Sequence, residues 1–143
     1  MINLVKCGQA FCSVALLAMV SVASAGVAVV VNPSVSDAFD KSQVERLFLG
    51  KSSSLPGGSK AQVVDQADGA AARVSFYQGV SGKSESQVKA YWSKLIFTGK
   101  GTPPGQVSDD GAVKSFVAST PGGIGYIDSG AVDESVRVVL ELP

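Results

Sequence analysis

The stretch Asp65-Gln66-Ala67-Asp68-Gly69-Ala70-Ala71 is the part of this chain whose residue types and spacing could do chemistry. It lies where a short apolar strand, residues 61–64, gives way to a predicted helix through a turn of small residues. Such a helix start presents free backbone N–H groups at the positive end of the helix dipole, and small side chains let an oxyanion approach them. The pattern also fits an ordinary strand-to-helix turn, in which Asp68 caps the helix and Gly69 supplies the backbone geometry.

Catalytic and metal-binding chemistry find little support in the composition. The sequence contains no histidine, and its two cysteines, Cys7 and Cys12, both fall within the first 25 residues. The usual general base, the commonest metal ligand and the Ser-His and Cys-His nucleophile pairs are therefore excluded. Asp109 and Asp110 stand at a predicted helix start, where they complement the dipole. We predict no catalytic residue, no metal ligand and no cofactor, and hence that the protein is not an enzyme.

The first 25 residues have the pattern of a secretory signal peptide. Lys6 supplies a positive charge, residues 10–22 are apolar, and Ala23-Ser24-Ala25 forms an A-x-A cleavage signal. An uncleaved membrane anchor is the alternative, since apolar residues continue to Val31 and a spanning helix needs about 20 of them. The β-branched residues 27–31 suit a strand better. We therefore predict cleavage after Ala25, a periplasmic or secreted protein, and no stable membrane insertion after cleavage.

The charge balance argues against polyanionic partners. The whole chain has twelve basic and twelve acidic residues, and removing Lys6 with the signal peptide leaves eleven basic ones against twelve acidic ones. This gives no electrostatic footprint for nucleic acid or for an anionic membrane surface. A small anion needs only local donors, so it stays a possible ligand. Residues 26–143 suit one domain with a proper hydrophobic core.

The elements that must position the candidate site form one α/β domain. Residues 27–31 are a continuous apolar run, typical of a strand buried on both faces. Two helices are marked by capping boxes, one at Asp40 with Gln43 and one at Ser84 with Gln87. In the second helix, a stripe of apolar residues is expected to face the core: Val88, Tyr91, Trp92, Leu95 and Ile96.

The remaining elements follow from turn residues and periodicity. A helix is expected from the Asp68 cap to about Tyr77, and another from a Ser108 cap to the stop at Pro121. Residues 98–105 are rich in Gly and Pro and are predicted to be a solvated loop. Residues 124–127 and 136–142 are predicted strands. The expected order is therefore β-α-β-α-α-α-β-β.

Three segments, in this order, resemble the phosphate-binding subunit of bacterial phosphate ABC transporters, the PstS-like type II periplasmic binding proteins. They are Leu47-Phe48-Leu49-Gly50-Lys51, Ala67-Asp68-Gly69-Ala70-Ala71, and the passage from Phe116 to Ile127 that contains Thr120-Pro121-Gly122-Gly123-Ile124-Gly125-Tyr126-Ile127. The family reads IFLGK, (R)SDGSGT and FV…TPGAIGYV at these places. The resemblance implies that residues 26–143 form a single lobe of a periplasmic-binding-protein fold, with a mixed, mostly parallel sheet flanked by helices.

The resemblance also implies a ligand site. In the family, hydroxyls and amides of the SGT stretch hold phosphate, an Arg lies just upstream, and an Asp accepts from protonated phosphate. Here Ala70-Ala71-Ala72 replaces the SGT stretch, and Asp65 or Gln66 replaces the Arg. Arg73 could substitute for that Arg, although an Arg one turn into a helix is commonly solvated. The candidate phosphate-binding residues are Asp68, Gly69, Ala70, Ala71 and Arg73.

Two functions are compatible with this sequence. The first is an exported solute-binding-like protein that binds phosphate or a similar small oxyanion at a helix N-terminus. Members of the family close two lobes around the anion, so a second copy or another envelope protein would complete the cleft. The alternative is a single-lobe structural or protein-interaction module of the cell envelope that binds no ligand. The alanines at residues 70–72 favour this alternative, because each lost charge-assisted hydrogen bond costs roughly 1.5–3 kcal/mol.

Overall fold

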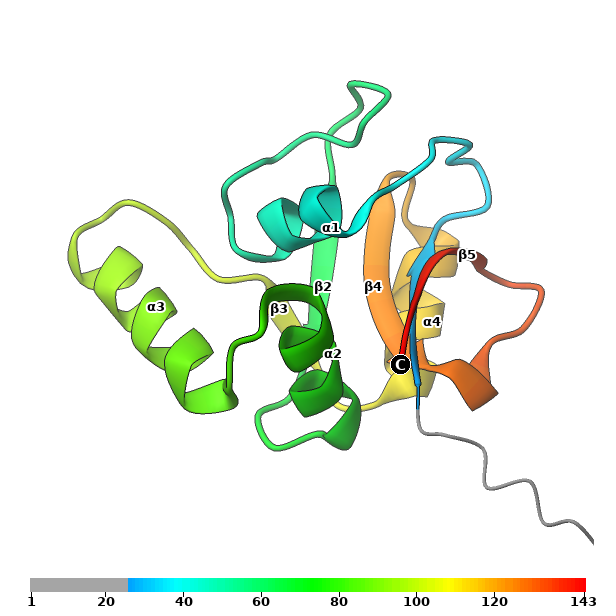
Figure 1. Cartoon of the computed structure of the whole chain (residues 1–143). Helices are drawn as coiled ribbons and strands as arrows, with labels where there is room; N and C mark the ends of the chain where they lie inside the picture. Colours follow the sequence, from blue (N-terminus) through cyan, green and yellow to red (C-terminus); the bar gives the residue numbers. More distant parts are fainter. Residues whose placement is uncertain (1–25) are drawn as a thin grey trace, which may run out of the picture.

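The computed structural model describes residues 26–143, and the apolar run at residues 27–31 forms its first strand. The predicted signal peptide and its cleavage site, residues 1–25, lie outside the described residues. Figure 1 shows the elements in chain order. They are β1 (Val27–Val31), α1 (Lys41–Phe48), β2 (Gln62–Gln66), α2 (Ala71–Ser81), α3 (Glu85–Phe97), β3 (Gly105–Val107), α4 (Asp110–Ser119), β4 (Gly123–Asp128), the 3-10 turn η1 (Ser129–Ala131) and β5 (Arg137–Leu142).

The strands form one five-stranded sheet in the order β3-β2-β4-β1-β5. β2 pairs in parallel with both β3 and β4, whereas β1 is antiparallel to β4 and to β5. Four strands therefore run in one direction and β1 runs in the other. This arrangement confirms the predicted α/β class with a mixed, mostly parallel sheet.

Alternate residues of β1 serve the two faces of the sheet, as the pleat of a strand requires. Val27, Val29 and Val31 belong to the larger core, which α1, α2 and α3 cover. Ala28 and Val30 belong to the smaller core under α4. All five residues are buried. The sheet is therefore the middle of three layers, and the continuous apolar pattern of β1 reflects burial on both sides (Figure 1).

Both predicted capping boxes are confirmed. The carboxylate of Asp40 accepts from the backbone N–H of Gln43, and the Gln43 side chain accepts from the N–H of Asp40. The same reciprocal pair joins Ser84 and Gln87 at the start of α3. None of the helices described over residues 26–143 is both long and apolar enough to cross a bilayer.

Two boundaries differ from the sequence-based expectation. The loop expected at residues 98–105 runs into a short strand, β3, whose backbone pairs with residues 64–66 of β2. A three-residue edge strand depends on its neighbour rather than on its own periodicity, so the local pattern did not indicate it. The cap of α4 is Asp109, whose carboxylate accepts from the N–H of Ala112, and not Ser108.

The expected apolar stripe of α3 is only partly buried. Val88 and Trp92 reach the core, whereas Ile96 is 55% exposed and Phe97, next to it, is 92% exposed. The helix lies at the side of the molecule and packs along α2, away from the middle of the sheet (Figure 1). Within the described residues, no other element therefore covers the C-terminal end of α3. The spacing of apolar residues in its sequence nevertheless matches that of a buried helix.

Candidate functional site

The turn that connects β2 to α2 has the geometry that its small residues predict. The N–H of Ala70 donates to the carbonyl of Ala67 over 3.1 Å, which closes a four-residue turn. Gly69, the third residue of that turn, has a φ of +83°. A positive φ at this position is the type II arrangement, which strongly favours glycine. Gly69 is therefore required by the backbone path.

The start of α2 carries no side-chain cap. The capping position is held by Ala70, and no side chain accepts from the first-turn N–H groups of the helix. The prediction that Asp68 caps this helix was wrong, because the turn places Asp68 two residues before the cap. Within residues 26–143, the backbone N–H groups of Ala71, Ala72 and Arg73 make no hydrogen bond. These three donors, which an oxyanion could use, are therefore free.

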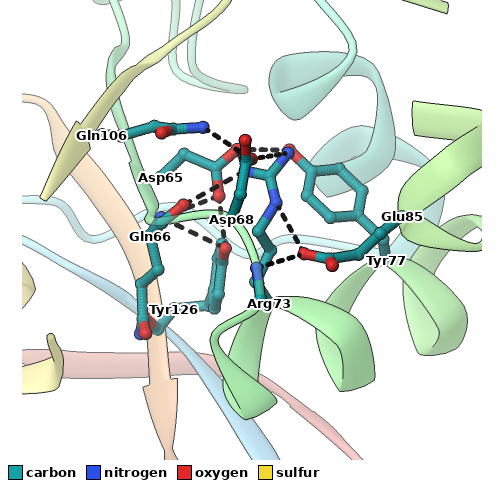
Figure 2. A network of polar contacts seen from close by, with 9 residues as sticks. Asp65, Gln66, Asp68, Arg73, Tyr77, Glu85, Gln106 and Tyr126 are labelled. Carbon is teal, nitrogen blue, oxygen red and sulfur yellow. Dashed lines mark hydrogen bonds and ion pairs between the residues drawn. The ribbon is translucent and has the colours of Figure 1, made fainter. Parts of the chain in front are cut away.

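The carboxylate of Asp65, at the C-terminal end of β2, is buried in a set of hydrogen-bond donors (Figure 2). It accepts from Arg73 Nη1 at 2.6 Å, from the Tyr77 hydroxyl at 2.7 Å and from the backbone N–H of Gln66 at 2.8 Å. The hydroxyl of Tyr126, on β4, donates to it as well. Four donors thus replace the water that burial removes from this charge.

Arg73 is buried rather than solvated, which contradicts the reading of this residue as an exposed helix arginine. Only 4% of it is accessible, since its guanidinium turns inward to Asp65 and also donates to the carbonyl of Gln66 at 3.1 Å. Its Nη2 lies 3.6 Å from the carboxylate of Asp68, and its Nε lies 3.2 Å from that of Glu85. Three carboxylates therefore surround one guanidinium (Figure 2).

The protonation of this cluster follows from burial and from the charge of Asp65. Burial, followed by the Asp65 carboxylate, raises the pKa of Tyr77 and of Tyr126 far above the ordinary tyrosine value. Burial acts to lower the pKa of Arg73, but the Asp65 carboxylate and the other neighbours outweigh it, and that pKa is raised. The guanidinium therefore stays charged and the two phenols stay neutral across the physiological range.

Glu85, from the first turn of α3, places a carboxylate oxygen against the turn before α2. Its Oε1 accepts from the N–H of Gly69 at 3.0 Å and is the same oxygen that lies near Arg73 Nε. A carboxylate of the protein thus takes up one of the donors that a bound anion would use. Among the described residues, Asp68 accepts a hydrogen bond from the side chain of Gln106 alone, at 3.2 Å, and the Asp68 side chain is 68% exposed.

The structure brings the predicted site residues together in one turn. Asp68, Gly69, Ala70 and Ala71 are consecutive, and Arg73 follows in the first turn of α2. Its guanidinium reaches toward Asp68. Among the described residues, no group of three or more carboxylate or other ligating side chains is arranged to hold a metal ion.

Sequence reasoning missed the supporting residues of this site. Three of them carried a readable signal: Asp65 and Gln66 are polar residues at the end of an apolar strand, and Tyr126 stands inside a buried strand. A buried tyrosine hydroxyl normally has a hydrogen-bond partner. Nothing in the sequence, however, indicated that these partners lie on the same side of the sheet as Glu85.

The Asp65–Arg73 pair predicts an asymmetry between two neighbouring carboxylates. Replacing Asp65 with Asn leaves the buried guanidinium without its main counter-charge, which we expect to lower the free energy of unfolding by about 3–5 kcal/mol. Asp68→Asn removes an exposed partner of the same arginine and should cost less than about 1 kcal/mol. Urea unfolding of the two variants measures both values. Equal losses would show that the burial of Asp65 has no special role.

The two buried tyrosines predict a steep loss of stability in alkali. Their pKa values are raised in the folded state, whereas tyrosines in the unfolded chain ionise near about pH 10. The stabilisation is therefore complete below that pH and falls above it, by about 1.4 kcal/mol per pH unit for each tyrosine. Urea unfolding at several alkaline pH values measures the slope, and Tyr77→Phe should halve it. A slope of zero in the unmutated protein would contradict the hydrogen-bonded, neutral phenols.

Comparison with solved structures places this fold. No protein-family profile matches the sequence. A protein from Clostridium perfringens, described as a phosphate ABC transporter substrate-binding protein with bound phosphate, aligns with a TM-score of 0.64 and 24% identity over 80% of this chain and 44% of its own. An ABC-type phosphate transport receptor from Vibrio cholerae aligns with a TM-score of 0.64 and 19% identity over 80% of this chain and 45% of its own. PstS from Borrelia burgdorferi gives a TM-score of 0.61 and 15% identity, over 80% of this chain and 47% of its own.

These identities are low, and the chain spans less than half the length of each of these proteins. What the alignments establish is the architecture, since their TM-scores are well above those of unrelated folds. The resemblance drawn from the three sequence segments is thus matched by the structure. Residues 26–143 have the fold of a single lobe of the substrate-binding proteins of phosphate ABC transporters.

Proposed function

We propose that this protein is an exported solute-binding-like protein that binds phosphate or a similar small oxyanion at the N-terminus of α2. The observation that carries the proposal is the free start of that helix, where Ala71, Ala72 and Arg73 offer three backbone N–H groups and no side chain caps them. Export rests on the signal peptide predicted for residues 1–25. Phosphate as the ligand rests on the proteins that share this fold, which are described as phosphate receptors.

The free N–H groups suit an anion for two physical reasons. They lie at the positive end of the helix dipole, where a negative charge is stabilised. The methyl side chains at residues 70–72 leave the backbone open to close approach. The hydroxyl donors of the related motif are absent, so the backbone would carry the binding. We therefore expect a weak dissociation constant, in the millimolar range.

The carboxylates around the turn select the charge state of the ligand. Asp65 already neutralises Arg73, and Asp68 and Glu85 add two further negative charges beside it. A multiply charged anion would be repelled by this group at short range. A singly charged, protonated oxyanion is favoured, because its own O–H can donate to the exposed carboxylate of Asp68. We assign this accepting role to Asp68.

A single lobe encloses only one side of a small ligand. Binding sites for small molecules usually bury 70–90% of the ligand surface. We propose that a second copy of this chain, or another protein of the envelope, supplies the opposite wall. The partner would exclude water from the anion and strengthen its hydrogen bonds to the helix start.

The alternative function, a lobe that serves as a structural or interaction module without a ligand, is favoured by one observation. Glu85 already accepts from the N–H of Gly69 and lies within ion-pair distance of Arg73, so the protein supplies an anion of its own to these two donors. If a ligand never displaces the Glu85 carboxylate, this lobe keeps the fold of the phosphate-binding proteins but binds no oxyanion.

The same carboxylate gives the test of the proposed function. Glu85→Gln removes a negative charge that competes with the ligand, and we expect it to tighten phosphate binding roughly tenfold, because two charges about 4 Å apart interact by about 1 kcal/mol in water and by about 4 kcal/mol near a protein surface. Isothermal titration calorimetry with inorganic phosphate measures this change. Glu134→Gln, the same charge change on the turn before β5, is the control and should leave the affinity unaltered.

The outcomes separate the two functions. Heat with a saturable curve, strengthened in Glu85→Gln and weakened in Asp68→Ala, supports the oxyanion site. No heat from either the unmutated protein or the Glu85 variant at high protein concentration would rule out phosphate binding by this lobe. The interaction module would then be the remaining reading.

A further inference from the structure

The C-terminal end of α3 exposes an aromatic side chain that the fold does not use. Phe97 is 92% exposed and Ile96, beside it, is 55% exposed, whereas the other large apolar side chain exposed within residues 26–143, Val74 on α2, is 40% exposed. A single apolar residue on a surface is normal, but a phenylalanine this exposed contributes almost no buried area to the fold. Ile96 and Phe97 form an apolar tip on α3, the helix at the left edge of the molecule in Figure 1.

Two lysines flank the apolar tip. Lys94 lies one turn before Phe97 on α3, and residues three apart share a face of a helix. Lys100 is held beside the last turn, because its backbone N–H donates to the carbonyl of Leu95 at 2.9 Å. Lys100 and Ile96 line the same hollow, which has a volume of about 540 Å³ and no carboxylate in its lining. The surface around the tip is therefore both apolar and basic.

The positive charge around the tip is not balanced by neighbours in the chain. No Asp or Glu occurs between Glu85 and Asp109. Within residues 26–143, the cations that form ion pairs are Arg73 and Lys114, so neither lysine beside the tip has a carboxylate partner. The near-zero net charge of the whole chain conceals this local excess.

The carboxylates of the candidate site do not cancel this charge. Asp65 and Asp68 line a separate pocket with Ile96, and both carboxylates lie within ion-pair distance of Arg73. Glu85 is at the opposite end of α3, a helix of 13 residues. Such a helix is about 20 Å long, well beyond the Debye length of about 8 Å at physiological salt. The tip therefore meets a charged surface independently of the turn before α2.

Two simpler explanations account for only part of this surface. Cations near the C-terminal end of a helix complement its dipole, but this role leaves the exposed aromatic ring unexplained. A second copy of the chain could cover the ring through a two-fold contact, which sets the same patch against itself. That contact would bring the lysines of both copies together, and like charges oppose it. A partner that is negatively charged and accepts an aromatic ring suits both features.

We propose that the apolar tip and its two lysines dock on an anionic lipid bilayer. The ring of Phe97 enters the interfacial region of the bilayer, where aromatic side chains are favoured, and Ile96 adds apolar area. The ammonium groups of Lys94 and Lys100 lie against lipid phosphates. The contact is peripheral and reversible, and it does not depend on the oxyanion site.

Co-sedimentation with lipid vesicles tests the proposal. The purified protein is mixed with vesicles of phosphatidylcholine alone, and with vesicles in which about one third of the lipid is phosphatidylglycerol. We expect binding to the anionic vesicles at roughly millimolar lipid, and roughly thirtyfold weaker binding to the neutral vesicles, the factor that two lysines produce. Salt at about 1 M should remove this difference, because the Debye length then falls to about 3 Å.

A matched pair of apolar variants assigns the binding to the tip. Phe97→Ser should weaken binding to the anionic vesicles roughly tenfold or more, since it removes the ring that enters the interface. The side chain is 92% exposed, so the change should not disturb the fold. Val74→Ser removes the other exposed apolar side chain and should leave the binding unaltered. All variants share residues 1–25, so any contribution of that segment is common to them.

A matched pair of charge variants assigns the preference for anionic lipid. The double change Lys94→Gln with Lys100→Gln should remove most of the roughly thirtyfold difference between the two kinds of vesicle. Lys41→Gln with Lys60→Gln makes the same charge change at two exposed lysines on other elements, and should keep the full difference.

The possible results decide what occupies the tip. Binding that Phe97→Ser weakens and that both control variants preserve supports the bilayer contact. Equal binding by Phe97→Ser and the unmutated protein would overturn it. So would a lack of binding to the anionic vesicles, and a protein with an acidic surface would then be the partner to seek. Self-association without lipid, seen by sedimentation velocity and lost in Phe97→Ser, would make the tip an interface between copies and contradict the proposal.

Discussion

The buried carboxylate of Asp65 is the interaction on which the site depends. It ties together three elements, because it lies at the end of β2 and accepts from Arg73 and Tyr77 on α2 and from Tyr126 on β4. Aromatic packing supports the same connection, since the ring of Phe76 on α2 stacks on that of Tyr126 with centroids 4.0 Å apart. The direction in which α2 leaves the sheet is therefore set by a charge that cannot be left unpaired inside the protein.

The ion pair with Asp65 limits how strongly Arg73 can attract an anion. Arg73 is committed to Asp65, so its charge is largely balanced within the protein and does little to attract a distant anion. In the proposed site, an oxyanion would therefore be held mainly by the free backbone N–H groups at the helix start. Arg73 is thus chiefly a positioning residue.

The features that could be predicted from the sequence depend on residues that lie close together in the chain. The capping boxes at Asp40 and Ser84 involve residues three apart, and the burial of β1 follows from its own apolar run. These features, with the three family-like segments, were enough for the α/β class and for a lobe of this kind. The assignment of residues 68–71 and Arg73 to a ligand site stays a prediction.

What could not be predicted depends on contacts between distant residues. Asp65 and Tyr126 are separated by 61 positions, and their meeting requires the parallel pairing of β2 with β4. The burial of Arg73 depends on its ion pair with Asp65, which lies on β2, so it requires the packing of α2 against that strand. The wrong assignment of Asp68 as a cap has a more local cause: the turn around Gly69 takes two more residues before the helix begins, and the carboxylate then faces Gln106 and Arg73.

The central claim is that the uncapped start of α2 is a binding site for a small oxyanion. Backbone amide shifts measured by nuclear magnetic resonance during a titration with inorganic phosphate test it most directly. The account predicts that the largest shifts occur at the amides of Gly69, Ala71, Ala72 and Arg73. Shifts that are absent there, or that concentrate at another helix start such as that of α4, would contradict it.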